Sequence, residues 1–146
     1  MTILELRYWS LEMPKTHFEN LKLYQLAEKL AGEIWEIVIK WDQLPKYTVG
    51  QQIVKSADGI GSCIAEGSGR GTAQDNRRFI GIARGSLYET KHWLRRAFKR
   101  KLLTKAQIDS LKGTVDDLTP TLNGYWRSVS NAAANERLNK GRKSKL

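Results

Sequence analysis

Cysteine, proline and long apolar runs are all scarce in this chain of 146 residues. The single cysteine, Cys63, cannot close an internal disulfide, which excludes a disulfide-stabilised scaffold. Only Pro14, Pro45 and Pro120 interrupt the chain, so long helices are permitted. The longest apolar runs, such as Ile37 to Ile39, fall far short of the roughly 18 residues that a membrane span requires. These absences predict a helical protein with no membrane segment.

Secretory and metal-binding features are also missing. The amino terminus carries Glu5 and Glu12, with neither a basic flank nor a continuous apolar segment, so we expect no signal peptide and a cytoplasmic protein. His17 and His92 lie too far apart in sequence to suggest a zinc site. No pair of carboxylates has metal-ligand spacing. We therefore expect no metal, no cofactor and no enzymatic activity.

Positive charge, in contrast, is abundant and concentrated. The chain has 25 Lys and Arg against 15 Asp and Glu, a formal net charge of +10. Residues 70–101 hold ten of these cations and only two acids, Asp75 and Glu89, so this segment alone carries ten minus two, or +8. At 100° per residue its apolar positions fall on one side, and a cationic stripe that includes Tyr88 falls opposite.

Such a stripe matches the charge of a polyanion. Contacts with phosphates release condensed counterions, which favours salt-dependent binding to RNA or DNA, and Tyr88 could stack on a base. The candidate nucleic-acid-binding residues are Arg70, Arg77, Arg84, Tyr88, Lys91, Arg95, Lys99, Arg142 and Lys143. The pattern is equally consistent with a solvated helix face that binds nothing.

Apolar residues recur at spacings of three and four in four segments, which predicts four amphipathic helices. The stripes run from Leu23 to Trp41, from Val49 to Ile64, from Phe79 to Ala97 and from Ile108 to Val129. Thr48, Thr72 and Thr104 each precede Gln or Asp by three residues and are expected to cap the last three helices. Because short connections make neighbours antiparallel, we predict an all-α, antiparallel up-down-up-down four-helix bundle over residues 18–130.

The two ends differ from the bundle. Residues 1–17 form an N-terminal arm in which Leu4, Leu6 and Tyr8 alternate with charged residues, a strand-like pattern with no second strand in the chain. We expect this arm to dock irregularly or to pair with another chain. Residues 131–146 form a basic tail, expected to be flexible, with five cations against Glu136.

A second apolar strip accompanies the main stripe of the first helix. It consists of Leu21, Tyr24, Trp35 and Ile39, and it predicts a subunit interface, because a monomer gains nothing by exposing it.

Three polar or reactive features admit competing interpretations. Glu66, which lies beside Gly67, and Glu89, one helical turn after Gly85, are interpreted as buried partners for Lys or Arg that fix helix register, with an acid-base role as the alternative. Cys63 has no histidine nearby and is interpreted as a small residue at a helix contact. The glycine-rich residues 67–71 could hold a phosphate at a helix N-terminus, but they lack a Lys-Ser or Lys-Thr pair and serve equally as a turn.

Two segments on consecutive helices carry a family resemblance. Residues 64–70 read Ile-Ala-Glu-Gly-Ser-Gly-Arg, and residues 82–89 read Ile-Ala-Arg-Gly-Ser-Leu-Tyr-Glu. With residues 52–57, Phe79 and residues 122–126, they resemble the four-helix bundle proteins first noted in 23S rRNA intervening sequences, from about Phe18 to Val129. Lys55 and Cys63 stand where that family usually has arginine and asparagine.

The resemblance implies a basic bundle without known enzymatic activity that assembles as a ring, commonly a pentamer. A related branch, the accessory variability determinant (Avd) proteins of diversity-generating retroelements, implies binding to RNA or DNA and to a reverse transcriptase. We therefore expect a non-enzymatic, homo-oligomeric protein that binds structured RNA, as an accessory to a reverse transcriptase. The alternative is a protein-only oligomeric scaffold with no nucleic-acid role.

Overall fold

The computed structural model describes residues 2–4 and 17–145. Apart from its first few residues, of which Ile3 and Leu4 are exposed, the expected N-terminal arm lies outside the described residues, as does most of its alternating pattern.

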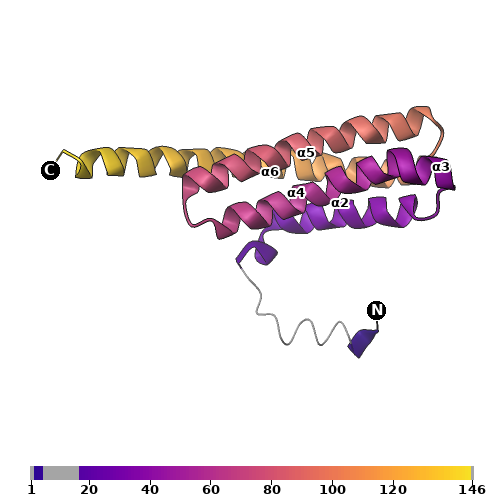
Figure 1. Cartoon of the computed structure of the whole chain (residues 1–146), viewed down its shortest axis with the longest axis horizontal. Coiled ribbons are helices and arrows are strands. Elements are labelled where there is room, and N and C mark those ends of the chain that lie inside the picture. Colours follow the sequence, from indigo (N-terminus) through magenta and orange to yellow (C-terminus); the bar gives the residue numbers. More distant parts are fainter. Residues whose placement is uncertain (1, 5–16, 146) are drawn as a thin grey trace.

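Four long helices make up the fold. They are α2 (Lys22–Val38), α4 (Gln51–Gly69), α5 (Ala73–Lys99) and α6 (Lys105–Lys143). Each packs against two neighbours, in the order α2, α4, α5, α6 and back to α2. Figure 1 shows the four lying side by side, joined by turns at alternate ends. The prediction of an all-α, up-down-up-down four-helix bundle is therefore confirmed.

Short helical pieces lie before α2 and α4. A 3-10 turn, η1 (His17–Asn20), precedes α2, and α3 (Gln43–Pro45) with a π-helical turn, η2 (Lys46–Gly50), leads directly into α4. Thr48 lies inside this run, and its hydroxyl donates to the Leu44 carbonyl at 2.7 Å. The predicted cap at Thr48 was wrong, because helical backbone already begins at Gln43.

The other two predicted caps are confirmed. The Thr72 hydroxyl accepts the amide of Asp75 at 3.2 Å at the start of α5. At the start of α6, Thr104 Oγ1 accepts the amide of Gln107 at 3.2 Å, and the Gln107 side chain accepts the amide of Thr104 at 2.9 Å. These reciprocal bonds satisfy amides that have no partner within the helix.

The core lies along the bundle axis, where the predicted stripes meet. Its largest fully buried apolar side chains are Leu30, Ile34, Ile53, Ile60, Ile64, Ile80, Leu87, Leu118 and Leu122. Helices α4 and α5 approach closely at small residues, since a Cβ added to Gly67 would lie 2.9 Å from the Cβ of Phe79. The Thr90 hydroxyl also donates to Ser56 Oγ at 3.0 Å between these two helices.

Helix α6 extends beyond the rest of the bundle. Its 39 residues span about 58 Å at 1.5 Å per residue. Ala133 is fully buried, whereas the side chains from Arg137 to Lys145 are exposed. Figure 1 shows this end projecting past the turn between α4 and α5. The basic segment expected to be a flexible tail from residue 131 thus continues the helix through Lys143.

Candidate nucleic-acid interface

The central part of the cationic stripe on α5 lies beside α6 and is only partly open to solvent. Arg77, Arg84 and Lys91 are all half-buried. Projection of one helix placed them opposite the core, but α5 has two neighbours, α4 and α6, so the stripe falls into the groove beside α6. The expectation that these three cations form a solvent-facing ridge is corrected accordingly.

Trp126 of α6 contacts two of these cations. The guanidinium carbons of Arg77 and Arg84 lie 5.1 Å and 5.6 Å from the centroid of its ring. Arg77 Nε also donates to the Ser130 hydroxyl at 3.0 Å. A cation over an aromatic face contributes from about 0.5 kcal/mol when exposed to about 2 kcal/mol when desolvated. Both arginines therefore stabilise the contact between α5 and α6.

Tyr88 is half-exposed, but two cations of its own helix flank its ring. The Lys91 ammonium lies 5.4 Å from the ring centroid, and the guanidinium carbon of Arg84 lies 5.6 Å from it. Arg84 Nη2 also donates to the Tyr88 hydroxyl at 3.3 Å. A base that stacked on Tyr88 would have to displace one of these cations.

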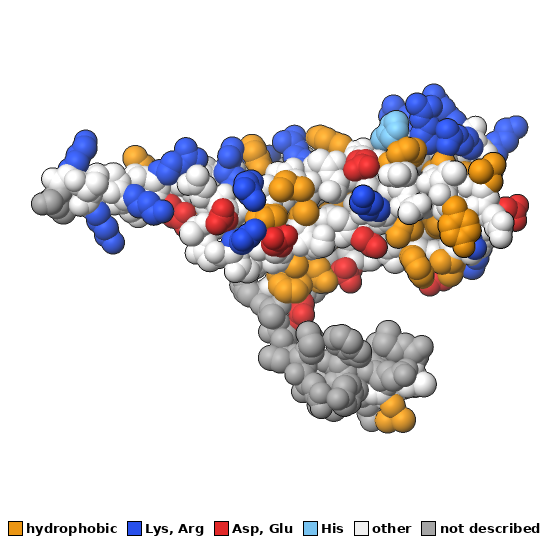
Figure 2. Space-filling model, in the orientation of Figure 1, with side chains coloured by type: hydrophobic (Ala, Val, Ile, Leu, Met, Phe, Trp, Pro, Cys, Tyr) orange, Lys and Arg blue, Asp and Glu red, His pale blue; other side chains and the backbone are white. Residues whose placement is uncertain are grey.

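Exposed cations gather toward the two ends of the molecule instead. The α5 cluster is Arg95, Arg96, Lys99, Arg100 and Lys101, and the α6 cluster is Arg137, Lys140, Arg142, Lys143 and Lys145. Neither residues 95–101 nor residues 137–145 contain an acid. Among the described residues, the ion pairs involve Arg70, Lys105 and Lys112, and none involves a member of either cluster. Figure 2 shows a dense group of Lys and Arg at the end near the turn from α5 into α6, and further Lys and Arg spread along the projecting end of α6 and the adjoining part of the bundle.

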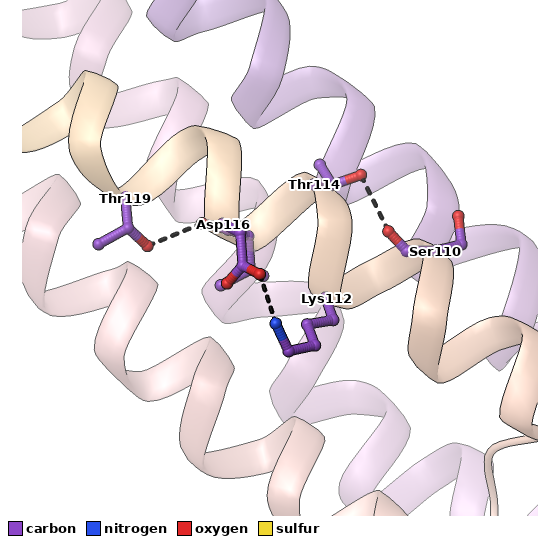
Figure 3. Close-up of polar contacts among 6 residues, drawn as sticks. Ser110, Lys112, Thr114, Asp116 and Thr119 are labelled. Atoms are coloured by element: carbon purple, nitrogen blue, oxygen red, sulfur yellow. Dashed lines mark hydrogen bonds and ion pairs between the residues drawn. The ribbon is translucent and has the colours of Figure 1, made fainter.

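Some cations outside the two clusters have partners. Arg70 pairs with Glu66 at 3.1 Å, and its guanidinium carbon lies 4.8 Å from the Phe79 ring centroid. Figure 3 shows Lys112 reaching along α6 to Asp116. This hydrogen bond, together with the attraction of the Asp116 charge, raises the pKa of the Lys112 ammonium.

Phe98 is an aromatic residue that the sequence analysis missed. It lies within the α5 cluster, is 58% exposed, and lines an open groove of about 270 Å³ with apolar residues of α5, α6 and their connection. Lys91 and Arg95 also line this groove. The signal was present in the sequence, because Phe98 follows Lys91 by seven residues and so falls on the same helical stripe.

Glu66 and Glu89 do not link helices. Both are exposed, Glu66 pairs with Arg70 one turn along α4, and Glu89 accepts the Trp93 indole N–H at 3.4 Å within α5. Glu66 lies beside Gly67 and Glu89 lies one helical turn after Gly85, which suggested burial, but both side chains are exposed. The prediction that Glu66 and Glu89 fix helix register was wrong, because each side chain contacts only its own helix.

Two other carboxylates link helices. Glu33 of α2 accepts the hydroxyls of Thr114 at 2.6 Å and Ser110 at 3.0 Å, both on α6. Glu136 of α6 accepts the backbone amides of Ala73 at 2.7 Å and Gln74 at 3.4 Å, at the first turn of α5. Glu136 therefore occupies the helix N-terminus where a phosphate was considered. The turn between α4 and α5 contains Gly71, whose φ of 83° lies in the left-handed region.

The predicted interface strip divides into two parts. Leu21 and Tyr24 are half-buried and pack on the core, and the Tyr24 ring meets the Phe18 ring edge-on at 4.9 Å between centroids. Trp35 and Ile39 are 54% and 39% exposed, and they line an open groove of about 530 Å³ together with Tyr47. The exposed apolar surface thus lies at the α3 end of α2.

The described residues include side chains of the kinds that ligate metals, and one thiol. Among them, no group of three His, Cys, Asp or Glu could hold a metal ion. Burial raises the pKa of the Cys63 thiol, which lowers the fraction of reactive thiolate. No described helix is long and apolar enough to cross a membrane.

Comparison with known proteins assigns the family. The profile described as "23S rRNA-intervening sequence protein" matches residues 19–124, most of the chain. The chain belongs to this family. One solved structure with the same fold is a protein of unknown function from the S23 ribosomal protein family of Bacteroides thetaiotaomicron. It has a TM-score of 0.63 and 19% identity, and the match covers 71% of this chain and 97% of that chain. No curated protein matches significantly. The family match ends before the α6 cluster begins.

Proposed function

We propose that this chain is a non-enzymatic nucleic-acid-binding protein whose ligand is structured RNA. The observation that carries the proposal is the pair of exposed cation clusters, each with five Lys or Arg and no acid within its segment. Unpaired, solvated cations at this density attract a phosphate backbone and release its counterions. The family name, which links these proteins to intervening sequences of 23S rRNA, supports RNA as the partner.

Phe98 supports structured RNA in particular. Proteins recognise RNA mainly at loops and ends, where unpaired bases can stack on aromatic side chains. Phe98 offers an exposed ring beside Arg95 and Lys99. A stem with an unpaired loop would supply both the phosphates and the base that this surface suits.

A narrower form of the proposal concerns the partner protein and the assembly. We infer, from the resemblance to the Avd proteins, that the chain acts beside a reverse transcriptase in a diversity-generating retroelement. We also infer a homo-oligomer, with a pentamer favoured, that forms through the groove of Trp35, Ile39 and Tyr47. A reverse-transcriptase gene beside the gene for this chain would support the first inference.

The experiment is a titration of a labelled RNA hairpin with the wild-type chain at several salt concentrations. We expect log affinity to fall linearly with log salt, with a slope of about −4 or steeper for five or more phosphate contacts. Phe98→Ala should weaken hairpin binding by about 1–3 kcal/mol, the contribution of one stacked base, without changing that slope. Tyr88→Ala is the matched control and should have a smaller effect.

The second candidate is a protein-only scaffold, which the aromatic groove at Trp35 and Tyr47 favours. In that case the cations only solvate the assembly. Hairpin affinity would then be very weak and would not respond to Phe98→Ala, while the assembly itself would persist.

A further inference from the structure

The two cation clusters lie far apart along the long axis of the bundle. The α5 cluster adjoins the turn into α6, and the α6 cluster begins at Arg137, so helix α6 itself separates them. From Lys105, the distance along α6 is about 48 Å to Arg137 and about 57 Å to Lys143, at 1.5 Å per residue. The fold therefore fixes the separation of the two clusters.

The surface between the clusters offers few free cations. On α5, the interval from Arg78 to Arg95 spans about 25 Å and holds only Arg84 and Lys91, both half-buried against aromatic rings. On α6, Lys112 is bound to Asp116, and Arg127 is the one further cation before Arg137. Between the clusters on α5 and α6, Arg78 and Arg127 are exposed, so cations are sparser there than in either cluster.

We propose that the two clusters bind one double-stranded nucleic-acid stem together, so that the molecule measures stem length. This inference rests on the proposed function and deepens it by naming the ligand class. A span of 48 to 57 Å corresponds to about 14 to 17 base pairs at 3.4 Å each in B-form DNA. A few more base pairs are needed in A-form RNA, which is more compact along its axis.

The projecting end of α6 suits this role. Its four charged helical residues point in different directions around the helix, because positions 137, 140, 142 and 143 differ by 100° per residue. A stem can therefore meet cations on whichever side it approaches. This segment lies outside the family match at residues 19–124, whereas the α5 cluster lies within it.

Two RNA duplexes of different length test the inference. A duplex of about 10 base pairs is too short to reach both clusters, and one of about 22 base pairs is long enough. For the wild-type chain, we expect the short duplex to give a salt slope of about −4.5 and the long duplex about −9, from five and ten contacts. Binding through both clusters should raise affinity for the long duplex by about a hundredfold or more.

Matched variants locate the effect. One carries Arg95→Gln, Arg96→Gln, Lys99→Gln and Arg100→Gln, and the other carries Arg137→Gln, Lys140→Gln, Arg142→Gln and Lys143→Gln. Either should remove the gain for the long duplex and leave short-duplex binding within about a factor of three, because one cluster remains. An equimolar mixture of the two variants should not restore the gain.

The outcomes separate this inference from the proposed function. Binding of both duplexes with equal slopes would overturn the length measurement while leaving nucleic-acid binding in place. Restoration by the mixture would also overturn it, since the clusters would then act from different copies. Failure of the wild-type chain to bind any duplex or hairpin would overturn the proposed function and this inference together.

Discussion

At the scale of single residues, partners within the fold decide which charges remain available to a ligand. Arg77, Arg84 and Lys91 lie on the same stripe as Arg95, yet each is half-buried beside an aromatic ring. The difference arises because Trp126 and Tyr88 lie beside the first three cations. The sequence showed the stripe, but which of its members face α6 depends on bundle geometry and was not predictable from one helix.

Packing within the fold also decides which carboxylates connect helices. Glu66 and Glu89 were selected from the sequence because Gly67 and Gly85 lie next to them or one helical turn away, whereas Glu33 and Glu136 form contacts between helices. Each of these two lies far in sequence from its partners. Only the packing of α2 and α5 against α6 brings them together, so no local pattern could identify them.

Glu136→Gln should reduce stability, because the carboxylate accepts two amides at the positive end of α5. We expect a loss of about 1 kcal/mol, the usual magnitude for a helix N-terminal cap, measured by urea denaturation. Glu66→Gln is the matched control and should cost at most about 0.5 kcal/mol, since it removes an exposed pair within one helix. Equal effects of the two substitutions would contradict the assignment.

Lys101 occupies an unfavourable backbone conformation. It has a φ of 59°, at the position after the end of α5 where glycine is usual, and the amide of Leu102 bonds to the Ala97 carbonyl at 3.0 Å. Lys101→Gly should therefore stabilise the fold by about 1 kcal/mol. The same substitution should weaken RNA binding, because it removes one cation of the α5 cluster. A more stable variant with unchanged RNA affinity would show that this lysine makes no phosphate contact.

At the scale of elements, periodicity predicted the helices well and their ends less well. The stripes of three and four residues identified all four helices, and the caps at Thr72 and Thr104 are confirmed by their hydrogen bonds. The helical segment before α4 was missed because its π-helical turn has a different period and no capping signal. The extension of α6 was missed because charge suggested disorder, while buried Ala133 and the Glu136 contact hold the helix in place to that point.

Hydrogen exchange along α6 should reveal where tertiary support ends. Amides up to about Ala133 should be protected by global stability, because the helix packs on the bundle there. Amides beyond Arg137 should exchange much faster, since a helix without tertiary contacts is marginal in water. Added RNA duplex should slow exchange in this last segment. Equal protection along the whole of α6 would contradict a free projecting end.

At the scale of the whole molecule, the surface combines charge at the two ends with an apolar groove at the α3 end of α2. Trp35 and Tyr47 are 54% and 67% exposed, which is unusual for aromatic side chains in a monomer. This groove, more than the full strip predicted from the sequence, is the candidate surface for self-association. The predicted strip was longer because periodicity does not distinguish Leu21 and Tyr24, which pack on the core.

Trp35→Glu should dissociate an assembly without unfolding the chain, because a buried charge is costly at an interface and harmless at an exposed site. Light scattering should show the wild-type mass at several times 16.7 kDa and the variant mass near 16.7 kDa. Circular dichroism should confirm that the variant keeps its helices. A wild-type monomer at micromolar concentration would refute this interface.

The most direct test of the whole account compares RNA binding by the wild-type chain with RNA binding by a variant that lacks most of the α5 cluster. Fluorescence anisotropy at several salt concentrations would follow a hairpin whose stem of about 22 base pairs reaches both clusters. The hairpin would be bound by the wild-type chain and by the variant with Arg95, Arg96, Lys99 and Arg100 changed to Gln. Because these four cations are exposed and unpaired, we expect the salt slope to become shallower by about 3 to 4, with a large loss of affinity. Unchanged affinity and slope in a folded variant would contradict the claim that the exposed ends of this bundle hold nucleic acid.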